Sequence, residues 1–393
     1  MNAVNPFTPD FGRRPPVLAG RDDIIDRMKT VLAAGPSRRE FTTLLLGPRG
    51  VGKTTVLAAI ANDAQQAGWR TIRVNVPLTQ DPDRGAVGII SEKIRDHLED
   101  ISPQPKRRLT GMSMPLLAAG ATWEHVAAAQ PTYQKLLDTL VGATVDIGGA
   151  GVLLAIDEFH NITPADASFV AGALQEIVKI DQKPLAFIAA GLPHIEHTLL
   201  TDEGFTFFHR CHRDRVEGIN LQDAMDAIGR PLADNSFFIS GPHLRRAAAA
   251  TRGLGYAVQS LGHHLWEIAG PPPAEITDNQ VDEAIALMEG DVDTHVVVPI
   301  WSRLSPADKR FLCTMVGDDG PSRIADVAAR LGTAATSAPV YRQRLLKQGA
   351  IVEAGRGFIR FASEAIKDRA AQEKSLTEMT PEQPPTNPQS SAQ

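Results

Sequence analysis

Apolar residues recur along the chain in two patterns, one typical of buried strands and one typical of helices. Short runs rich in Leu, Ile, Val and Ala lie within 41–46, 70–76, 151–161 and 184–193, and most end in polar or glycine-containing segments. The stretch 54–68 instead keeps its apolar residues at helical spacing and ends at Gly68. Strands that alternate with helices in this way predict an α/β fold with a parallel sheet covered on both faces.

A glycine-rich loop joins the first predicted strand to the first predicted helix. Its sequence, GPRGVGKT, fits the pattern G-x-x-x-x-G-K-[ST] of the P-loop. Glycines let the backbone point its N–H groups inward, as a cradle for phosphate oxygens at a helix N-terminus. In this motif the lysine, here Lys53, reaches the β- and γ-phosphates of ATP, and the hydroxyl of Thr54 ligates Mg²⁺. The predicted nucleotide-binding residues are Gly47, Pro48, Arg49, Gly50, Val51, Gly52, Lys53, Thr54 and Thr55.

Two adjacent acids, Asp157 and Glu158, end the third predicted strand. Ligands of parallel sheets bind beyond the carboxyl ends of the strands, so we expect this pair to lie near the glycine-rich loop and near 191–193. Asp157 is then predicted to hold Mg²⁺ through water, and Glu158 to orient and deprotonate the attacking water. The alternative is that both acids only cap the following helix, where negative charge is favourable.

The order of these motifs resembles that of the AAA+ and STAND class of P-loop ATPases, most closely bacterial ATPases related to origin-recognition initiators. The segment 17–32 is similar to the family's N-terminal segment, which implies that Gly20 and Arg21 lie near the adenine. The resemblance also implies a helical lid after the sheet, and an arginine that reaches the γ-phosphate of a neighbouring subunit in a homo-oligomer. Candidates for that arginine are Arg210, Arg213 and Arg215.

The sequence departs from the family where a polar sensor residue is expected. The fourth strand ends in AAGLP without Asn, Ser or Thr, and His194 just beyond is the candidate substitute. Arg252 stands where the lid of relatives carries a second sensor arginine, but Tyr256 replaces the proline that STAND members tend to have. The residues assigned to catalysis are Glu158, Lys53, Arg210 and Arg213. Because the polar sensor is missing, the alternative is a scaffold that binds nucleotide but does not hydrolyse it.

The pattern of the C-terminal part predicts a winged helix-turn-helix domain. Helical segments at 305–316, 323–332 and 337–350 precede two alternating strands around the turn GRG. Between residues 299 and 369 there are 12 lysines and arginines against 7 aspartates and glutamates, in a chain of net charge −6. This asymmetry predicts phosphate contacts with duplex DNA, and the alternative is a winged helix that contacts protein. The predicted DNA-binding residues are Tyr341, Arg342, Arg344, Lys347, Arg356 and Arg360.

Composition adds boundaries to this interpretation. With 393 residues the chain is expected to form several domains, which we place at 1–215 (P-loop ATPase core), 216–295 (helical lid), 296–370 (winged helix) and 371–393 (disordered tail). Its two cysteines, Cys211 and Cys313, have no disulfide or zinc spacing, and His209 and His212 beside Cys211 lack a second cluster. No apolar run approaches the length of a bilayer span, so the protein is expected to be soluble and cytoplasmic.

The sequence thus predicts an ATP-binding and hydrolysing switch of the AAA+ type that binds duplex DNA through its C-terminal domain. ATP or ADP and Mg²⁺ are the expected ligands, and no membrane partner is expected. The alternative from another class is a STAND-like signalling ATPase whose winged helix contacts protein and not DNA.

Overall fold

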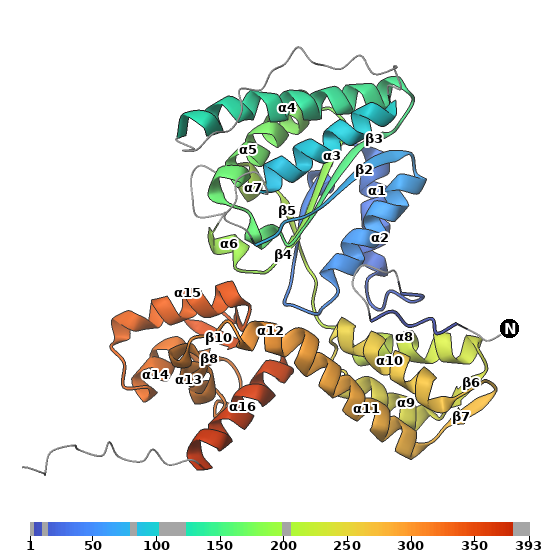
Figure 1. The fold of residues 1–393 in the computed structure, drawn as a ribbon, viewed down its shortest axis with the longest axis vertical. Helices are drawn as coiled ribbons and strands as arrows, with labels where there is room; N and C mark the ends of the chain where they lie inside the picture. The colour runs from blue at the N-terminus through green and yellow to red at the C-terminus, as the bar shows by residue number, and fades with distance from the viewer. Residues whose placement is uncertain (1–3, 10–14, 79–84, 102–122, 199–205, 380–393) are drawn as a thin grey trace, which may run out of the picture. The chain divides into compact units, whose positions relative to one another are not determined.

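The computed structural model describes residues 4–9, 15–78, 85–101, 123–198 and 206–379 (Figure 1). Contacts divide the chain into two units, 1–290 and 291–393, a boundary close to the predicted one at 295/296. The end of the predicted tail, residues 380–393, lies outside the described residues. Within the described part, no helix combines the length and apolarity needed to cross a membrane.

The first unit is built on a five-stranded parallel sheet with the strand order β2-β3-β4-β1-β5. The strands are β1 (Thr42–Leu46), β2 (Trp69–Asn75), β3 (Gly151–Asp157), β4 (Leu185–Gly191) and β5 (His212–Arg215). All residues of β1 and β4 are buried, as the continuous apolar runs of a doubly covered parallel sheet require. The α/β prediction and the four predicted strands are confirmed.

The fifth strand was missed because its sequence, HRDR, carries no apolar pattern. It lies at the edge of the sheet, where only β1 pairs with it. An edge strand tolerates charged side chains, which also discourage pairing with another chain. A short charged strand of this kind has no strand signal in the sequence.

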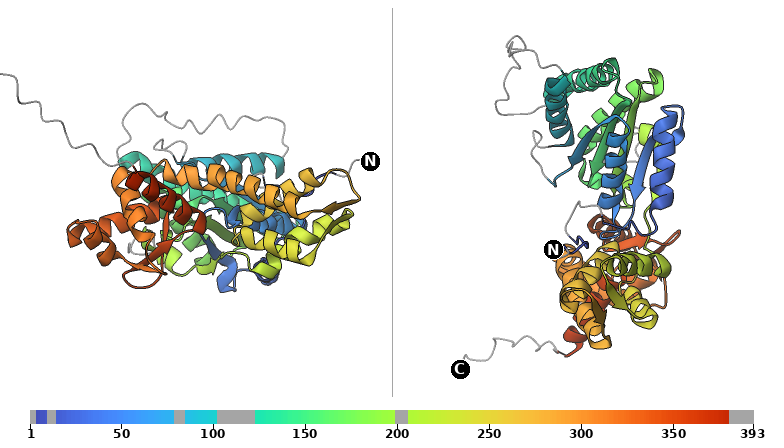
Figure 2. Two further views of the ribbon diagram at one scale, coloured as in Figure 1. Left: turned by 90° about the horizontal axis from the view of Figure 1, so that it is seen from below. Right: turned by 90° about the vertical axis from the view of Figure 1, so that its right-hand side faces the viewer.

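Helices cover both faces of the sheet. α1 and α2 lie on one face, and α3, α4 and α5 lie on the other (Figures 1 and 2). The bounds are α1 (Asp22–Ala34), α2 (Lys53–Gln66), α3 (Ala86–Ile101), α4 (Trp123–Asp146) and α5 (Pro164–Leu174), which continues as a π-helix over Gln175–Ile180. The short helices α6 (Ile195–Thr198) and α7 (Thr206–His209) precede β5.

A helical subdomain follows the sheet within the first unit. Its elements are α8 (Leu221–Asp234), β6 (Phe237–Ile239), α9 (Gly241–Ala250), α10 (Gly255–Ala269), β7 (Ala274–Ile276) and α11 (Asp278–Val292). α8 begins at Asn220, whose side chain accepts a hydrogen bond from the backbone of Asp223. The short parallel pair of β6 and β7 was not predicted. We call this subdomain, residues 216–290, the lid; the last two residues of α11 lie beyond the boundary of the first unit.

The second unit packs helices around a three-stranded antiparallel sheet with the order β8-β10-β9. Its elements are a π-helix (Asp293–Val297), α12 (Val298–Trp301), α13 (Pro306–Met315), β8 (Ser322–Arg323), α14 (Ile324–Arg330), α15 (Ala338–Gln348), β9 (Ile351–Glu353), β10 (Phe358–Phe361) and α16 (Glu364–Met379). Phe311, Leu345 and Ile359 are fully buried in its core. The prediction of a disordered tail from residue 371 is wrong for 371–379, because α16 extends through this segment.

Candidate nucleotide site

The glycines of the loop between β1 and α2 occupy positions that a side chain could not. Gly50 and Gly52 have φ angles of 78° and 96°, in the left-handed region that favours glycine. A Cβ on Gly47 would lie 2.3 Å from the carbonyl oxygen of Val216. The loop can therefore curl tightly at the N-terminus of α2, where backbone N–H groups attract anions.

Lys53 is the first residue of α2 and is buried beneath this loop. Its Nζ donates a hydrogen bond of 2.7 Å to the carbonyl oxygen of Pro48. Burial lowers the pKa of Lys53 to about 8, against the opposing attraction of Glu158 and Asp157. The pKa of this buried amine thus lies close to neutral pH. An added anion such as phosphate would stabilise its charged form.

The predicted acid pair lies at the same edge of the sheet as the glycine-rich loop. β1 pairs with β4 so that Leu46 lies beside Gly191, and Gly47 N donates to Gly191 O at 3.3 Å. β4 in turn pairs with β3, which ends in Asp157. The structure thus brings together three strand ends that are far apart in the sequence. Glu158 stands at the N-cap position of the following 3₁₀-helix (Phe159–Asn161) but makes no side-chain cap hydrogen bond.

The carboxylate of Glu158 contacts two basic side chains. Its Oε2 lies 3.3 Å from Nε2 of His160 and 3.9 Å from Nη1 of Arg49. Glu158 has a φ of 51°, uncommon for a residue other than glycine, and its N–H donates to Oδ1 of Asp157 at 2.8 Å. His160 was not predicted, and it also contacts the ring of His194 at a centroid distance of 5.7 Å.

Residues 17–188 match the family model of the AAA ATPase domain. We call the matched region, residues 17–188, the AAA domain. The fold is shared with the Walker-type ATPase PABY2304 of Pyrococcus abyssi, at a TM-score of 0.63 and 14% identity over 91% of this chain and 98% of that chain. It is also shared with the ORC2 protein of Aeropyrum pernix, at a TM-score of 0.56 and 14% identity over 94% and 98%.

Two further comparisons concern the C-terminal residues and the sequence as a whole. Residues 295–368 match a domain of unknown function (DUF8462). A comparison of the sequence with curated proteins finds no match. The predicted resemblance to P-loop ATPases of the AAA type is supported by the family match over residues 17–188 and by the shared fold.

The predicted Mg²⁺ ligands of the AAA domain supply oxygen atoms only. Thr54 follows Lys53 in the first turn of α2, and Asp157 ends β3. Mg²⁺ in phosphate sites takes one or two carboxylates together with phosphate oxygens and water, so this pair fits the ion. Among the described residues, no group of three or more His, Cys, Asp or Glu side chains could hold a metal without such a ligand.

Arg21 is buried and braces the glycine-rich loop from behind. Its Nη2 donates to the carbonyl oxygens of Val51 at 3.0 Å and of Glu217 at 2.6 Å. Burial lowers the pKa of Arg21, opposed by the carboxylates of Asp223 and Glu217. Gly20 has a φ of 63°, and a Cβ there would lie 2.6 Å from Oδ2 of Asp223. In this structure Arg21 links the loop to the start of the lid.

The first turn of α10 in the lid also touches the glycine-rich loop, a contact that the sequence does not reveal. Tyr256 N donates to Gly50 O at 3.0 Å. A Cβ on Gly50 would lie 2.9 Å from the side chain of Leu254, and one on Gly255 would lie 3.1 Å from Val51 O. The AAA domain therefore holds its loop between the sheet and the lid.

The candidate finger arginines lie at or next to edge strand β5. Arg213 and Arg215 both approach the carboxylate of Glu196, with distances of 3.7 Å from Nε and 2.7 Å from Nη2. Arg210 is exposed and precedes the strand. Arg215 pairs with Leu46, the last residue before the glycine-rich loop.

The predicted DNA-binding residues of the second unit fall into two groups. Arg342 forms an ion pair with Glu353, and Arg344 donates to Oδ1 of Asp308 at 2.6 Å and lies over the ring of Tyr341. Tyr341 itself stacks on Phe311 at 4.9 Å. These three side chains take part in packing within the unit. The other three, Lys347, Arg356 and Arg360, are exposed, and so is Arg344 despite its ion pair.

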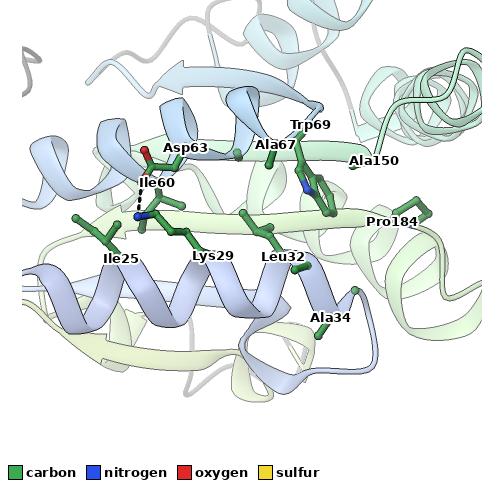
Figure 3. A pocket seen from close by; sticks show the side chains of 13 residues that line it. Ile25, Lys29, Leu32, Ala34, Ile60, Asp63, Ala67, Trp69, Ala150 and Pro184 are labelled. Atoms are coloured by element: carbon green, nitrogen blue, oxygen red, sulfur yellow. Dashed lines mark ion pairs between the residues drawn. The ribbon is translucent and has the colours of Figure 1, made fainter.

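A separate cavity of about 330 Å³ lies between α1 and α2, at the amino ends of the strands (Figure 3). It is lined mainly by apolar residues such as Ile25, Leu32 and Trp69. An ion pair between Lys29 and Asp63, 3.4 Å apart, lies at its margin (Figure 3). Because the glycine-rich loop lies at the opposite, carboxyl ends of the strands, this cavity is not the phosphate site.

Proposed function

We propose that the protein is an ATP-binding and hydrolysing switch of the AAA+ type whose second unit binds duplex DNA. The observation that carries the ATP part is the meeting of buried Lys53 with Asp157 and Glu158 beneath a loop of left-handed glycines. The positive charge of residues 299–369 and the exposure of Lys347, Arg356 and Arg360 support the DNA part.

Each residue of the AAA domain has a distinct task in this proposal. The inward N–H groups of the loop and the ammonium of Lys53 bind the phosphates. Thr54 and Asp157 hold Mg²⁺, which supplies charge neutralisation at the phosphates when bound. Glu158 orients the attacking water and accepts its proton.

Glu158 must leave its contacts before it can accept that proton. Its carboxylate lies 3.3 Å from Nε2 of His160 and 3.9 Å from Nη1 of Arg49, so it must turn away from both side chains to reach the attacking water. The arginine supplied by a neighbouring subunit, Arg213 or Arg210, completes the site, as the resemblance implies. Arg213 must first separate from Glu196. Both requirements predict slow turnover for an isolated subunit.

The second unit supports DNA binding through its topology and its charge. α14 and α15 are joined by the short turn 331–337, and β9 and β10 form a hairpin, the arrangement of a winged helix. Ala354 N donates to Phe358 O at 3.0 Å across the hairpin. Lys347 on α15 and Arg356 and Arg360 on the hairpin are the proposed phosphate contacts.

Fluorescence anisotropy of a labelled duplex tests this proposal with the full chain in ATP, ADP or neither. The switch predicts different DNA affinities in ATP and ADP. Replacing Lys347, Arg356 and Arg360 with Ala should lower the slope of log K against log salt by about 3 units, one for each phosphate contact. The matched control replaces Arg303, Arg310 and Lys367, which lie on other elements of the same unit. Equal slopes for the two triple variants would exclude the DNA contacts.

A second candidate function is a signalling ATPase whose second unit contacts protein. It is favoured by the ion pairs of Arg342 with Glu353 and of Arg344 with Asp308, which neutralise part of the basic surface. Absence of duplex binding at low salt in every nucleotide state, together with ATP binding by the same preparation, would support this alternative.

A further inference from the structure

The N-terminal residues 5–8 lie along helix α10 of the lid and contact it through Asn5, Phe7 and Thr8. We propose that this segment, which we call the strap, positions the lid against the glycine-rich loop, and that Phe7 is its anchor. The inference deepens the proposed ATP function and rests on it. Nothing in the sequence pattern announces the strap, because its partners are more than 250 residues away.

Phe7 fills a notch in α10 that exists because residue 262 is glycine. Its side chain is 3% exposed. A Cβ built on Gly262 would lie 2.2 to 2.7 Å from three carbons of the Phe7 ring. Glycine inside a helix is unfavourable relative to alanine, so its presence here is explained by the ring that occupies the space of the methyl group.

Polar contacts fix the strap on both sides of Phe7. Asn5 Nδ2 donates to Oε1 of Glu267 at 2.8 Å and to the carbonyl oxygen of His263 at 3.3 Å. Thr8 N donates to Oε1 of Gln259 at 3.2 Å. Residues three to four positions apart lie on one side of a helix, so the strap follows a single face of α10 over about two turns.

The strap and the nucleotide loop share the same helix. The first turn of α10 meets the loop where Tyr256 N donates to Gly50 O. The later turns hold the strap, and a helix of this length moves as a rigid body. The same N-terminal region also reaches the loop through Arg21, which donates to Val51 O. Restraining α10 therefore restrains the lid side of the phosphate cradle.

Loosening the strap should speed the release of nucleotide, because the first turn of α10 then leaves its contact with the glycine-rich loop more often. Phe7→Ala removes the anchor. Gly262→Ala places a methyl group where the ring lies and should displace the ring, so both changes act on one contact. Gly142→Ala in α4 is the matched control, because a Cβ there meets nothing within 4 Å.

The experiment measures dissociation of a fluorescent ATP analogue from the full chain by stopped flow. We expect dissociation to be about five- to twentyfold faster for Phe7→Ala and for Gly262→Ala, and unchanged for Gly142→Ala. The double variant should be no faster than Phe7→Ala alone, because the methyl group has no ring left to displace. Additive effects, or an unchanged rate for Phe7→Ala, would overturn the strap.

Two controls separate this inference from the proposed function. If the wild-type chain does not bind the analogue more tightly than Lys53→Ala, the ATP function itself fails. Hydrogen exchange measured without nucleotide then still reports whether the strap packs on α10. Phe7→Ala should make the backbone amides of α10 exchange faster. Where Phe7→Ala does not fold, Phe7→Leu takes its place and should give a smaller increase in rate. Faster exchange without faster dissociation would show a purely structural contact and would overturn the positioning role.

Discussion

The nucleotide site around Lys53 and the basic residues of the second unit differ in how their charged side chains are held. In the AAA domain, Lys53 is buried, its pKa is lowered to about 8, and its neighbours are two carboxylates and a loop of backbone amides. In the second unit, two of the five predicted basic residues are paired with acids of the same unit, and four of the five, Arg344 included, are exposed. The first arrangement favours the binding of an anion in a buried site, whereas the second leaves basic side chains exposed on a surface.

The difference follows from the type of signal in each sequence. The pattern GPRGVGKT fixes backbone conformation at Gly50 and Gly52 and the position of Lys53 at the start of a helix, so it defines a three-dimensional site. A count of lysines and arginines contains no geometry. Arg344, predicted to contact DNA, donates to Asp308, which also forms the capping box with Ser305 at the start of α13.

The largest expected effect is the loss of ATP binding on removal of Lys53. Lys53→Ala should weaken Mg·ATP binding at least about 100-fold, since a charge-assisted contact to phosphate is lost in a buried site. Isothermal titration calorimetry measures this directly. Lys29→Ala, at a lysine that is about half exposed on α1, is the control and should bind as the wild type does. Equal affinities for the two variants would contradict the assignment of the site.

A second test separates hydrolysis from binding within the same site. Glu158→Gln should slow phosphate release about 100-fold while Mg·ATP still binds, because the amide cannot accept the proton of the attacking water. Turnover assays and calorimetry on the same variant provide both quantities. Glu176→Gln, at an exposed position of the π-helix after α5, should leave both unchanged. Undiminished turnover in Glu158→Gln would assign the base to another residue.

What the sequence reveals of this fold and site depends on how local the determining contacts are. The strands, the glycine-rich loop and the acid pair are encoded within segments of a few residues and were predicted. The edge strand β5, the brace by Arg21 and the contact of His160 with Glu158 depend on neighbours brought together by the fold. Only the identity of His160, two positions after Glu158, could have suggested a partner for the carboxylate.

We expect Arg344 to stabilise the second unit more than it binds DNA. Arg344→Ala leaves Asp308, whose side chain is 6% exposed, without its guanidinium partner. The expected loss is about 1–3 kcal/mol in the free energy of unfolding, with little change in DNA affinity where the protein is folded. Chemical denaturation of the full chain measures it against Arg310→Ala, an exposed arginine of the same helix as Asp308. A loss of DNA affinity without a loss of stability would restore Arg344 to the DNA surface.

The smallest expected effect is a pH dependence that belongs to the AAA site alone. Without nucleotide, the pKa of Lys53 is about 8, and a bound triphosphate raises it by favouring the ammonium. The complex therefore holds more protons than the free protein above pH 8, so affinity falls as pH rises through 8 and is level below pH 7. Between pH 7 and 9 the loss should be about tenfold, with proton uptake visible in calorimetry at pH 8.5 as a dependence of the measured enthalpy on the buffer. Lys53→Arg should remove this dependence, because a guanidinium does not titrate in this range. Binding that stays constant from pH 7 to 9 would mean that Lys53 is already fully charged without phosphate. The buried lysine of the AAA domain would then differ less from the exposed basic residues of the second unit than the structure indicates.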